Sequence, residues 1–329
     1  MRIGLTYNLK SDVPVVAGVE DWSAECEERA TVELIAGALA HLGHTVIDLP
    51  YGRDLALRIA AAQPEIVFNI AEGWFGRNRE SLVPAVLELL DVPYSGSDAL
   101  TLGLALDKYL AKTVVAAAGL PVVASHLVSN PAQLAALSID FPAFVKPNYE
   151  GSSKGIRGAS RVNNREELAE RVGWVLANYR QPALIEPFLS GREFSIGILG
   201  NDPPVALPVL EVVDAQSSVT SEQFVYSFET KSGNLERLLC PAPLEEEEKN
   251  RLTEIAVRAH TALGCRDFSR VDIRLDDKGE PFFLEINPLP GLSAQSLLTV
   301  QAKAAGLSYD RLIAAILGSA CRRLGINVA

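Results

Sequence analysis

Residues 146–155 combine the residue types that bind phosphate groups. They read Lys-Pro-Asn-Tyr-Glu-Gly-Ser-Ser-Lys-Gly and directly follow a strand-like run. Glycines let a backbone approach a phosphate closely, serine amides and hydroxyls donate to its oxygens, and Lys146 supplies a positive charge. We interpret the segment as a mobile loop that covers phosphates, although most loops of this composition are ordinary turns. It does not match GxxxxGK[ST], which disfavours a P-loop ATPase.

A second set of polar residues lies on two strand-like runs joined by a turn. The runs are residues 269–275, Ser-Arg-Val-Asp-Ile-Arg-Leu, and residues 282–288, Phe-Phe-Leu-Glu-Ile-Asn-Pro. In a hairpin, the period of two places Arg270, Asp272 and Arg274 on one face. Glu285 and Asn287 likewise share a face. Asp272, Glu285 and Asn287 would then form an all-oxygen set that suits Mg²⁺ bridging nucleotide phosphates. Either strand alone could be an ordinary surface strand, but the joint pattern favours the metal site.

Histidines and cysteines do not indicate another chemistry. The histidines are His41, His44, His126 and His260, and they do not cluster in the sequence. The cysteines are Cys26, Cys240, Cys265 and Cys321, which have no metal-binding spacing and are interpreted as reduced thiols. The chain contains no GxSxG either, so the sequence gives no support to a hydrolase.

Length and composition favour a globular enzyme of two or three domains. The chain has 329 residues, of which 48% are hydrophobic and 22% are charged. Its formal net charge is −11 and no basic stripe stands out, so nucleic acid is not an expected partner. No apolar run approaches the ~20 residues that span a bilayer, and no apolar signal segment precedes the first strand. We therefore expect no membrane association and a cytoplasmic location.

The elements that must position these residues begin with a βαβαβ pattern. Strands are expected at residues 3–7, 46–49 and 66–70, with helices at 25–42 and 55–62. This order favours a parallel sheet with helices on both faces. Ligands of such sheets bind beyond the carboxyl ends of the strands, where Glu72, Gly73 and Trp74 follow the third strand.

The remainder predicts a smaller α+β region and then a strand-rich one. A helix at 104–118, a strand at 143–146, a helix at 165–179 and a strand at 183–186 come first. Strands at 193–199, 205–213, 271–275 and 282–287 and a helix at 312–324 follow. Residues 216–241 have little regular pattern and are interpreted as a lid. The acidic run 245–249 is interpreted as the first turn of a helix.

Four segments in order give the chain a clear resemblance to the D-alanine-D-alanine ligase branch of the ATP-grasp superfamily. They are Tyr94-Ser95-Gly96-Ser97 with Asp107-Lys108, Val145-Lys146-Pro147 with residues 150–155, Ile185-Glu186 with residues 191–194, and residues 270–272 with residues 284–291. The similarity runs from about Pro93 to Leu324. It implies a three-domain ATP-grasp fold with an N-terminal parallel α/β domain. The expected domains are residues 1–100, 101–187 and 188–329.

The resemblance also implies a nucleotide site and a metal site. By similarity, the ATP phosphates are held by Lys108 and Lys146, and Lys231 reaches the γ-phosphate. The loop that closes over the phosphates contains Glu150, Ser152 and Ser153. Adenine is faced by Glu186 and Leu189, and the ribose is held by Glu193. Asp272, Glu285 and Asn287 match the ligands of two Mg²⁺ ions, with Mn²⁺ as a possible replacement.

The reaction implied by the resemblance joins a carboxylate to an amine through an acyl phosphate, with release of ADP. By similarity, Arg270, the Gly291 N–H and Ser152 serve catalysis, and the first two stabilise a tetrahedral oxyanion. Ser296, with Leu297 beside it, matches a residue that binds the carboxylate of the attacking amino acid. The resemblance also implies a homodimer.

Departures from the family pattern fall on the first substrate's surroundings. Residues 7–14 do not contain the Gly-Gly loop and acidic residue of the family, Glu72 stands where the family has His, and Ser232 stands where it has Tyr. Glu72 could bind a cationic group, act as a base, or cap the helix near Ser81. Trp74, Arg77 and Arg79 are candidates to line a larger or differently charged substrate, and Arg77 and Arg79 could equally be solvated.

Three functions therefore remain open. The first is a ligase of two amino-acid-like molecules, D-alanine among them. The second is the same chemistry on a specialised precursor, such as a mycosporine or an antibiotic intermediate, which the altered residues favour. The third is a nucleotide-binding module without catalysis, although the metal and phosphate residues that it should have lost are all present.

Overall fold

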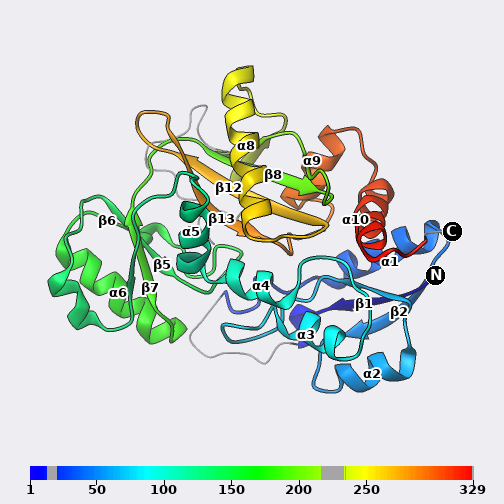
Figure 1. The fold of residues 1–329 in the computed structure, drawn as a ribbon. Coiled ribbons are helices and arrows are strands. Elements are labelled where there is room, and N and C mark those ends of the chain that lie inside the picture. The colour runs from blue at the N-terminus through cyan, green and yellow to red at the C-terminus, as the bar shows by residue number, and fades with distance from the viewer. Residues whose placement is uncertain (13–20, 216–232, 234, 328–329) are drawn as a thin grey trace.

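The computed structural model describes residues 1–12, 21–215, 233 and 235–327. These residues form three sheets with helices packed around them, and the two ends of the described chain lie close together (Figure 1). The first sheet is parallel and the other two are antiparallel. The predicted mixture of helices and sheets, with a parallel sheet at the N-terminus, is confirmed.

The N-terminal sheet has the strand order β2-β1-β3. Its strands are β1 (Arg2–Tyr7), β2 (Thr45–Pro50) and β3 (Ile66–Asn69), connected by α1 (Arg29–His41) and α2 (Leu55–Ala62). Ile3 pairs with Val46 on one side and with Ile66 on the other. All three strands run in one direction, so the segments after Tyr7 and Asn69 leave the same edge of the sheet. The short helix η1 (Lys10–Asp12) and residues 70–80 are therefore neighbours at that edge.

A helical layer links this sheet to the rest of the molecule. It contains α3 (Leu82–Leu89), α4 (Ala99–Leu106) and α5 (Lys108–Ala117). The single helix expected at 104–118 is wrong, because Asp107 is extended (φ −81°, ψ 92°) and separates α4 from α5. The Asp107 carboxylate accepts a hydrogen bond from the Leu110 N–H at 3.2 Å. This N-cap starts a new helix whose first residue is Lys108.

The second sheet has the order β4-β7-β5-β6. Its elements are β4 (His126–Val128), η2 (Pro131–Ala136), β5 (Ala143–Pro147), η3 (Gly158–Ser160), β6 (Arg161–Val162), α6 (Arg165–Tyr179) and β7 (Ala183–Pro187). Asn164 caps α6 by accepting from the N–H groups of Glu166 and Glu167. Val145, Val172 and Ile185 are among the residues of a separate small core between α6 and the sheet.

The third sheet has the order β11-β10-β8-β12-β13, and β9 also pairs with β8. Its elements are β8 (Glu193–Leu199), β9 (Val205–Ala206), β10 (Leu210–Asp214), β11 (Glu236–Leu239), α8 (Glu246–Ala262), β12 (Phe268–Leu275) and β13 (Pro281–Asn287). The single strand expected at 205–213 is wrong, because Leu207-Pro208-Val209 separates β9 from β10. Pro208 has no N–H to donate to a ladder. The acidic run does begin a helix, with Glu246, Glu247 and Glu248 in the first turn of α8.

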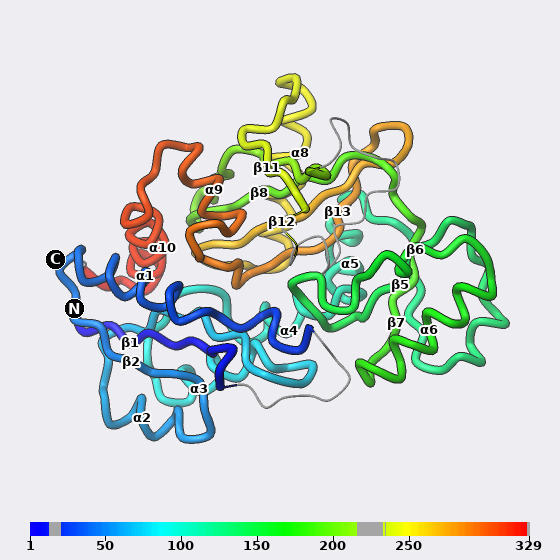
Figure 2. The backbone as a smooth tube through the Cα atoms, turned by 180° about the vertical axis from the view of Figure 1, so that it is seen from behind, coloured from blue at the N-terminus to red at the C-terminus, as the bar shows by residue number. Residues whose placement is uncertain are grey.

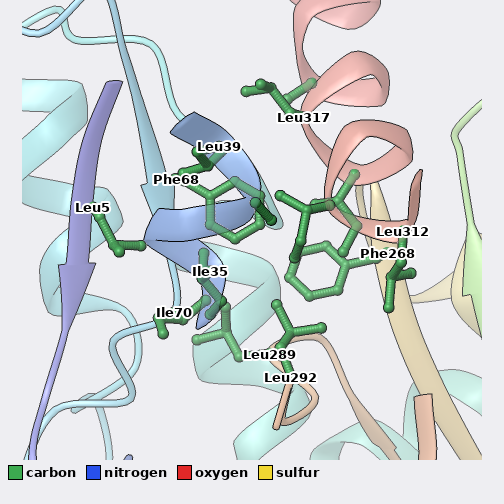
Figure 3. Close-up of a cluster of buried hydrophobic side chains, with 14 of the residues drawn as sticks. Leu5, Ile35, Leu39, Phe68, Ile70, Phe268, Leu289, Leu292, Leu312 and Leu317 are labelled. Carbon is green, nitrogen blue, oxygen red and sulfur yellow. The ribbon is translucent and has the colours of Figure 1, made fainter. Parts of the chain in front are cut away.

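The C-terminal helices α9 (Leu297–Ala304) and α10 (Tyr309–Leu324) return the chain to the N-terminal sheet. Figure 2 shows α10 beside α1 from the opposite side of the molecule. Leu5, Ile35 and Phe68 from the N-terminal sheet and its helix share one buried core with Phe268 and Leu312 (Figure 3). This shared core fixes the edge of the first sheet relative to the β12–β13 hairpin.

Candidate active site

A cavity of about 390 Å³ is lined by residues of the second and third sheets, by the segments that follow β1 and β3, and by other loops and helix ends. Nearly all of the residues predicted from the sequence for the site lie on its wall. Those on loops and helices are Glu72, Lys108, Glu150, Ser152, Ser153, Leu189, Gly291, Ser296 and Leu297. Those on strands are Lys146, Glu186, Glu193, Arg270, Asp272 and Glu285. Asn287 lines a smaller adjoining cavity, and Lys231 and Ser232 lie outside the described residues.

The β12–β13 hairpin brings the predicted metal ligands together. Asp272 pairs with Glu285 across the ladder, and the Asn287 Nδ2 group donates to Asp272 Oδ2 at 3.2 Å. A β-bulge follows this pair, because Ile273 is already opposite Phe283. Leu284 is therefore the extra residue, and both Leu284 and Glu285 line the cavity. Asp272, Glu285 and Asn287 offer carboxylate and amide oxygens of the kind that hard divalent cations prefer.

Cations surround the Glu285 carboxylate. Lys108 Nζ lies 3.1 Å from Glu285 Oε2 and also donates to the Glu150 carbonyl oxygen. Burial raises the pKa of Glu285, but Lys108, Lys146 and Arg270 outweigh it and lower that pKa to about 2. Glu285 is therefore an ionised carboxylate at neutral pH, as a metal ligand must be.

Arg270 and Asp272 form an ion pair at 2.8 Å beside this hairpin. Ser195 also donates to Asp272 Oδ1 at 2.7 Å, which fixes the carboxylate against β8. Across the cavity, Gly291 approaches the Ser296 hydroxyl so closely that a Cβ atom at residue 291 would lie 3.0 Å from it. Ser296 is the N-cap residue of α9, whose first residue is Leu297. The N-terminus of this helix therefore faces the cavity and favours an anionic group there.

Glu186 on β7 accepts hydrogen bonds from two buried lysines. Lys146 Nζ lies 3.0 Å from one of its oxygens, and Lys112 of α5 contacts the other. Burial opposes ionisation of Glu186, yet Lys112 and Lys146 lower its pKa to about 2. Burial lowers the pKa of Lys112 to about 8, against the opposing effect of Glu186. Lys146 is thus fixed in place, close to both β7 and the hairpin.

The loop 150–155 is held in a tight turn. Ser152 and Ser153 have positive φ angles of 49° and 59°, and Gly155 has a φ angle of 71°. Successive N–H groups in such a conformation form a concavity for anions. The Gly155 N–H donates to Asp21 at 2.8 Å, and the Gly151 N–H donates to Glu25 at 2.5 Å. The N-terminal segment therefore anchors the loop from both ends.

Four charged side chains reinforce this anchor. Arg79 lies 2.5 Å from Glu25, and Lys154 lies 3.1 Å from Glu25 and 2.5 Å from Glu150. Burial raises the pKa of Glu25, but Arg79 and Lys154 lower it to about 2. The two acidic and two basic side chains compensate one another.

The structure decides several questions about the residues after β3. Arg79 is only 2% exposed, so its interpretation as a solvated residue is wrong. The exposed Arg77 pairs with Asp107 at 2.9 Å, and Trp74 packs edge-on against Tyr51. Neither arginine nor Trp74 lines the cavity. The Glu72 N–H donates to Asn8 Oδ1 at 2.7 Å, whereas the Glu72 carboxylate has no hydrogen bond or ion pair with the described residues. The proposed capping role of Glu72 is therefore wrong.

Several residues of the site were not predicted. They are Asp21, Glu25, Glu80, Lys112 and Lys154. Lys154 was visible in the phosphate loop, but its carboxylate partners come from elsewhere in the chain. The remaining four sit on helices or loops without a distinctive local pattern, so only the tertiary structure shows them.

Two features are absent from the residues that the structure describes. They contain no group of three or more His, Cys, Asp or Glu side chains arranged to hold a metal ion, in line with a hairpin that offers two carboxylates and one amide. None of their helices combines the length and the apolar character needed to cross a membrane.

Comparison with known proteins gives consistent matches. A family profile described as D-ala D-ala ligase C-terminus matches residues 114–318. A D-alanine-D-alanine ligase of Pelotomaculum thermopropionicum is 31% identical over 308 residues, covering 90% of this chain and 93% of the relative. One from Syntrophotalea carbinolica is 34% identical over 299 residues, covering 89% and 91%. A crystal structure of D-alanine-D-alanine ligase from Bacillus anthracis complexed with ATP superposes with a TM-score of 0.74 at 23% identity, covering 98% of both chains.

Proposed function

From the premise that the chain belongs to the D-alanine-D-alanine ligase family of ATP-grasp enzymes, and is thus an ADP-forming, ATP-dependent ligase, we propose that the cavity described above is its active site. One observation carries this proposal. The Asp272–Glu285 pair, Lys108, Lys146, Arg270 and the loop 150–155 surround a single cavity, although they come from different sheets. Transfer of a phosphoryl group requires this combination of cations, oxygen ligands and backbone amides.

Adenine is assigned to the connection between β7 and β8. Glu186 and Leu189 line the cavity there, next to the apolar walls of Phe144 and Phe188. Glu193 begins β8 and is placed at the ribose. Lys108, Lys146 and the amides of Ser152 and Ser153 are assigned to the phosphates, together with Lys231 outside the described residues. Phe144 and Phe188 support this assignment, because a nucleobase needs apolar surface as well as hydrogen bonds.

Asp272, Glu285 and Asn287 would hold two Mg²⁺ ions, or Mn²⁺ in their place. Their oxygen donors and the ionised state of Glu285 fit hard cations. When bound, such ions neutralise charge on the phosphate oxygens. Lys108 and Arg270 form ion pairs with Glu285 and Asp272, so these cations lie next to the proposed metal ligands.

The chemistry proceeds in two steps. A carboxylate oxygen of the first substrate attacks the γ-phosphorus of ATP, the bond to the β-phosphate oxygen breaks, and ADP leaves. The amine of the second substrate then attacks the acyl carbon of the acyl phosphate. Arg270 and the Gly291 N–H stabilise the oxyanion, which collapses to an amide as phosphate leaves and the nitrogen loses its proton. Ser152 and the anchored loop exclude water from the acyl phosphate.

The attacking amino acid is assigned to the N-terminus of α9. Its carboxylate would accept from the Ser296 hydroxyl and the Leu297 N–H, where the helix dipole favours an anion. Within this reaction, D-alanine is one candidate substrate. A specialised precursor is the second candidate, because Glu72 gives the first-substrate side an extra carboxylate.

Release of ADP, measured with D- and L-amino acids singly and in pairs, separates the candidates. Strong turnover with D-alanine alone would exclude a specialised substrate. Turnover only with other acids would exclude D-alanine-D-alanine synthesis. Absence of turnover with all of them would exclude the joining of two amino acids and leave the specialised precursor as the candidate substrate.

We also propose a homodimer, a cytoplasmic location and domains at residues 1–100, 101–187 and 188–329. Exposed Leu57 and Leu89 on α2 and α3 offer apolar surface for a second copy. Light scattering tests the dimer, and Leu89→Asp should weaken it if α3 takes part.

The four free cysteines suit a reducing compartment. Each proposed domain contains one sheet.

A further inference from the structure

Helix α5 carries two buried lysines on one face, and only one of them lines the cavity. Lys108 and Lys112 are four positions apart, so their side chains are neighbours along the helix. Lys108 lines the cavity and pairs with Glu285, whereas Lys112 lies outside the cavity and pairs with Glu186. The Lys112 side chain is only 3% exposed. A buried ammonium group is costly without an anion beside it, so Lys112 and Glu186 depend on each other.

The two oxygens of Glu186 have different surroundings. Oε1 contacts Lys112 and lies 3.1 Å from the Ser125 hydroxyl. Oε2 lies 3.0 Å from Lys146 Nζ. Lys146 lines the cavity, whereas Lys112 and Ser125 do not. One oxygen is therefore held by groups behind the cavity wall, and the other by a group that a ligand in the cavity can reach.

The group formed by Glu186 and its two lysines has one positive charge in excess. Burial opposes the charge on Lys146, but Glu186 and Glu285 outweigh it and raise the pKa of Lys146. Burial lowers the pKa of Lys112 to about 8, with Glu186 opposing this effect and Lys146 adding to it. Lys112 is therefore mostly protonated at pH 7. An anionic ligand in the cavity would complete the charge balance, which suits the phosphates assigned to Lys146.

A phosphate would divide the charge of Lys146 between two anions. An ammonium group has three N–H donors, so Lys146 can bind a phosphate oxygen while it stays at Glu186. Its effect on Glu186 then weakens, because the same charge serves both partners. Lys112 lies outside the cavity, where the ligand does not compete for it. With a nucleotide bound, Lys112 would thus be the cation that keeps the buried Glu186 carboxylate ionised.

The ionisation of Glu186 decides which nucleobase fits beside it. An ionised carboxylate only accepts hydrogen bonds, whereas a protonated one can also donate. Adenine carries an amino donor where guanine and hypoxanthine carry a carbonyl acceptor. We propose that Lys112, supported by Ser125, is a positioning residue that holds Glu186 ionised and in place, so that the site selects adenine. The inference rests on the proposed function, because it requires adenine to lie at Glu186.

Equilibrium binding of ADP and IDP tests this selection without turnover. IDP carries hypoxanthine, so a carbonyl replaces the amino group of ADP. In calorimetric titrations with Mg²⁺, the wild type should bind ADP more tightly than IDP. Lys112→Met should reduce this preference about 10- to 100-fold, the range for a charged hydrogen-bond partner, and Ser125→Ala about 2- to 10-fold. Lys249→Met, which removes an exposed lysine paired with Glu246, is the control and should leave the preference unchanged.

The ratio of the two affinities separates positioning from a purely structural role. A structural role predicts that Lys112→Met weakens the binding of ADP and IDP equally. The positioning role predicts that ADP binding weakens more than IDP binding. Thermal unfolding checks the fold, which Lys112→Met should retain because Glu186 keeps Lys146 as a partner. If Lys112→Met does not fold, Ser125→Ala decides the question, and an unchanged preference in that variant overturns the proposal.

Glu186→Gln tests the adenine assignment itself. An amide donates as well as accepts, so this variant should lose the preference for ADP. If Glu186→Gln loses the preference and Lys112→Met keeps it, the role of Lys112 is overturned and the adenine assignment stands. If Glu186→Gln keeps the preference, or the wild type has none, the assignment and the inference are both overturned. ADP release in the panel above stays an independent measure of the ligase itself.

Discussion

At the scale of single residues, Glu285 provides the sharpest test of the metal assignment. Glu285→Ala removes one of two carboxylates from the β12–β13 hairpin and leaves Lys108 without its 3.1 Å partner. We expect Mg²⁺-dependent ADP release to fall by about 10³-fold, comparable to losing a principal electrostatic contact of the transition state. The residue borders a cavity rather than a packed core, so circular dichroism should show an intact fold.

Glu280→Ala is the control, since Glu280 lies at the exposed end of the same hairpin. Unchanged ADP release in Glu285→Ala would mean that the metal ligands lie elsewhere.

The sequence could predict Asp272, Glu285 and Asn287 because residue type and strand period carry that information. It could not predict that Arg79 and Lys154 both pair with Glu25, because the three residues come from distant segments of the chain.

At the scale of elements, the loop 150–155 depends on one glycine. Gly155 has a φ angle of 71°, and a Cβ added there would lie 2.8 Å from Pro147 Cδ and 3.1 Å from the Tyr179 ring. Gly155→Ala should therefore strain the loop by about 1–3 kcal/mol and shift the Ser152 and Ser153 amides. We expect the KM for ATP to rise about tenfold or more.

Gly158→Ala is the matched control, because no atom lies within 4 Å of a Cβ added at Gly158. An equal effect of both substitutions would show that loop geometry is not the cause. Steady-state kinetics with varied ATP measures the KM of both variants.

At this scale the sequence predicted most elements, since apolar periodicity specifies them. It missed the break at Asp107, which a side-chain cap creates, and the bulge at Leu284, which the pairing of two strands creates.

At the scale of the whole molecule, the arrangement of the sheets lay beyond prediction from sequence. Phe268 on β12 packs in one core with Leu5 and Ile35, which are more than 200 positions away along the chain. No local pattern identifies such partners. The parallel first sheet was predictable because alternating strands and helices allow few other arrangements. Its docking on α10 depends on side-chain shape.

Stability of the whole molecule should depend on pH through His260. This histidine of α8 is 2% exposed, and its ring nitrogen lies 2.8 Å from the Ser269 hydroxyl. Burial lowers the pKa of His260 from 6.5 to about 4. Between these values the unfolded chain binds a proton that the folded chain does not, so stability falls as pH decreases from about 6.5 to about 4. Since one pH unit corresponds to ~1.4 kcal/mol, His260 should contribute a loss of about 2 kcal/mol by pH 5.

Urea unfolding at pH 7.5 and pH 5 measures this contribution. His260→Gln should be less stable than the wild type at pH 7.5, because the buried site is repacked, but it should lose about 2 kcal/mol less on going to pH 5. His41→Gln is the control, since the His41 side chain is 73% exposed. If His260→Gln shows the same pH dependence as the wild type, another group must cause the acid sensitivity. Other titrating groups are common to both proteins, so the difference between them isolates the buried histidine.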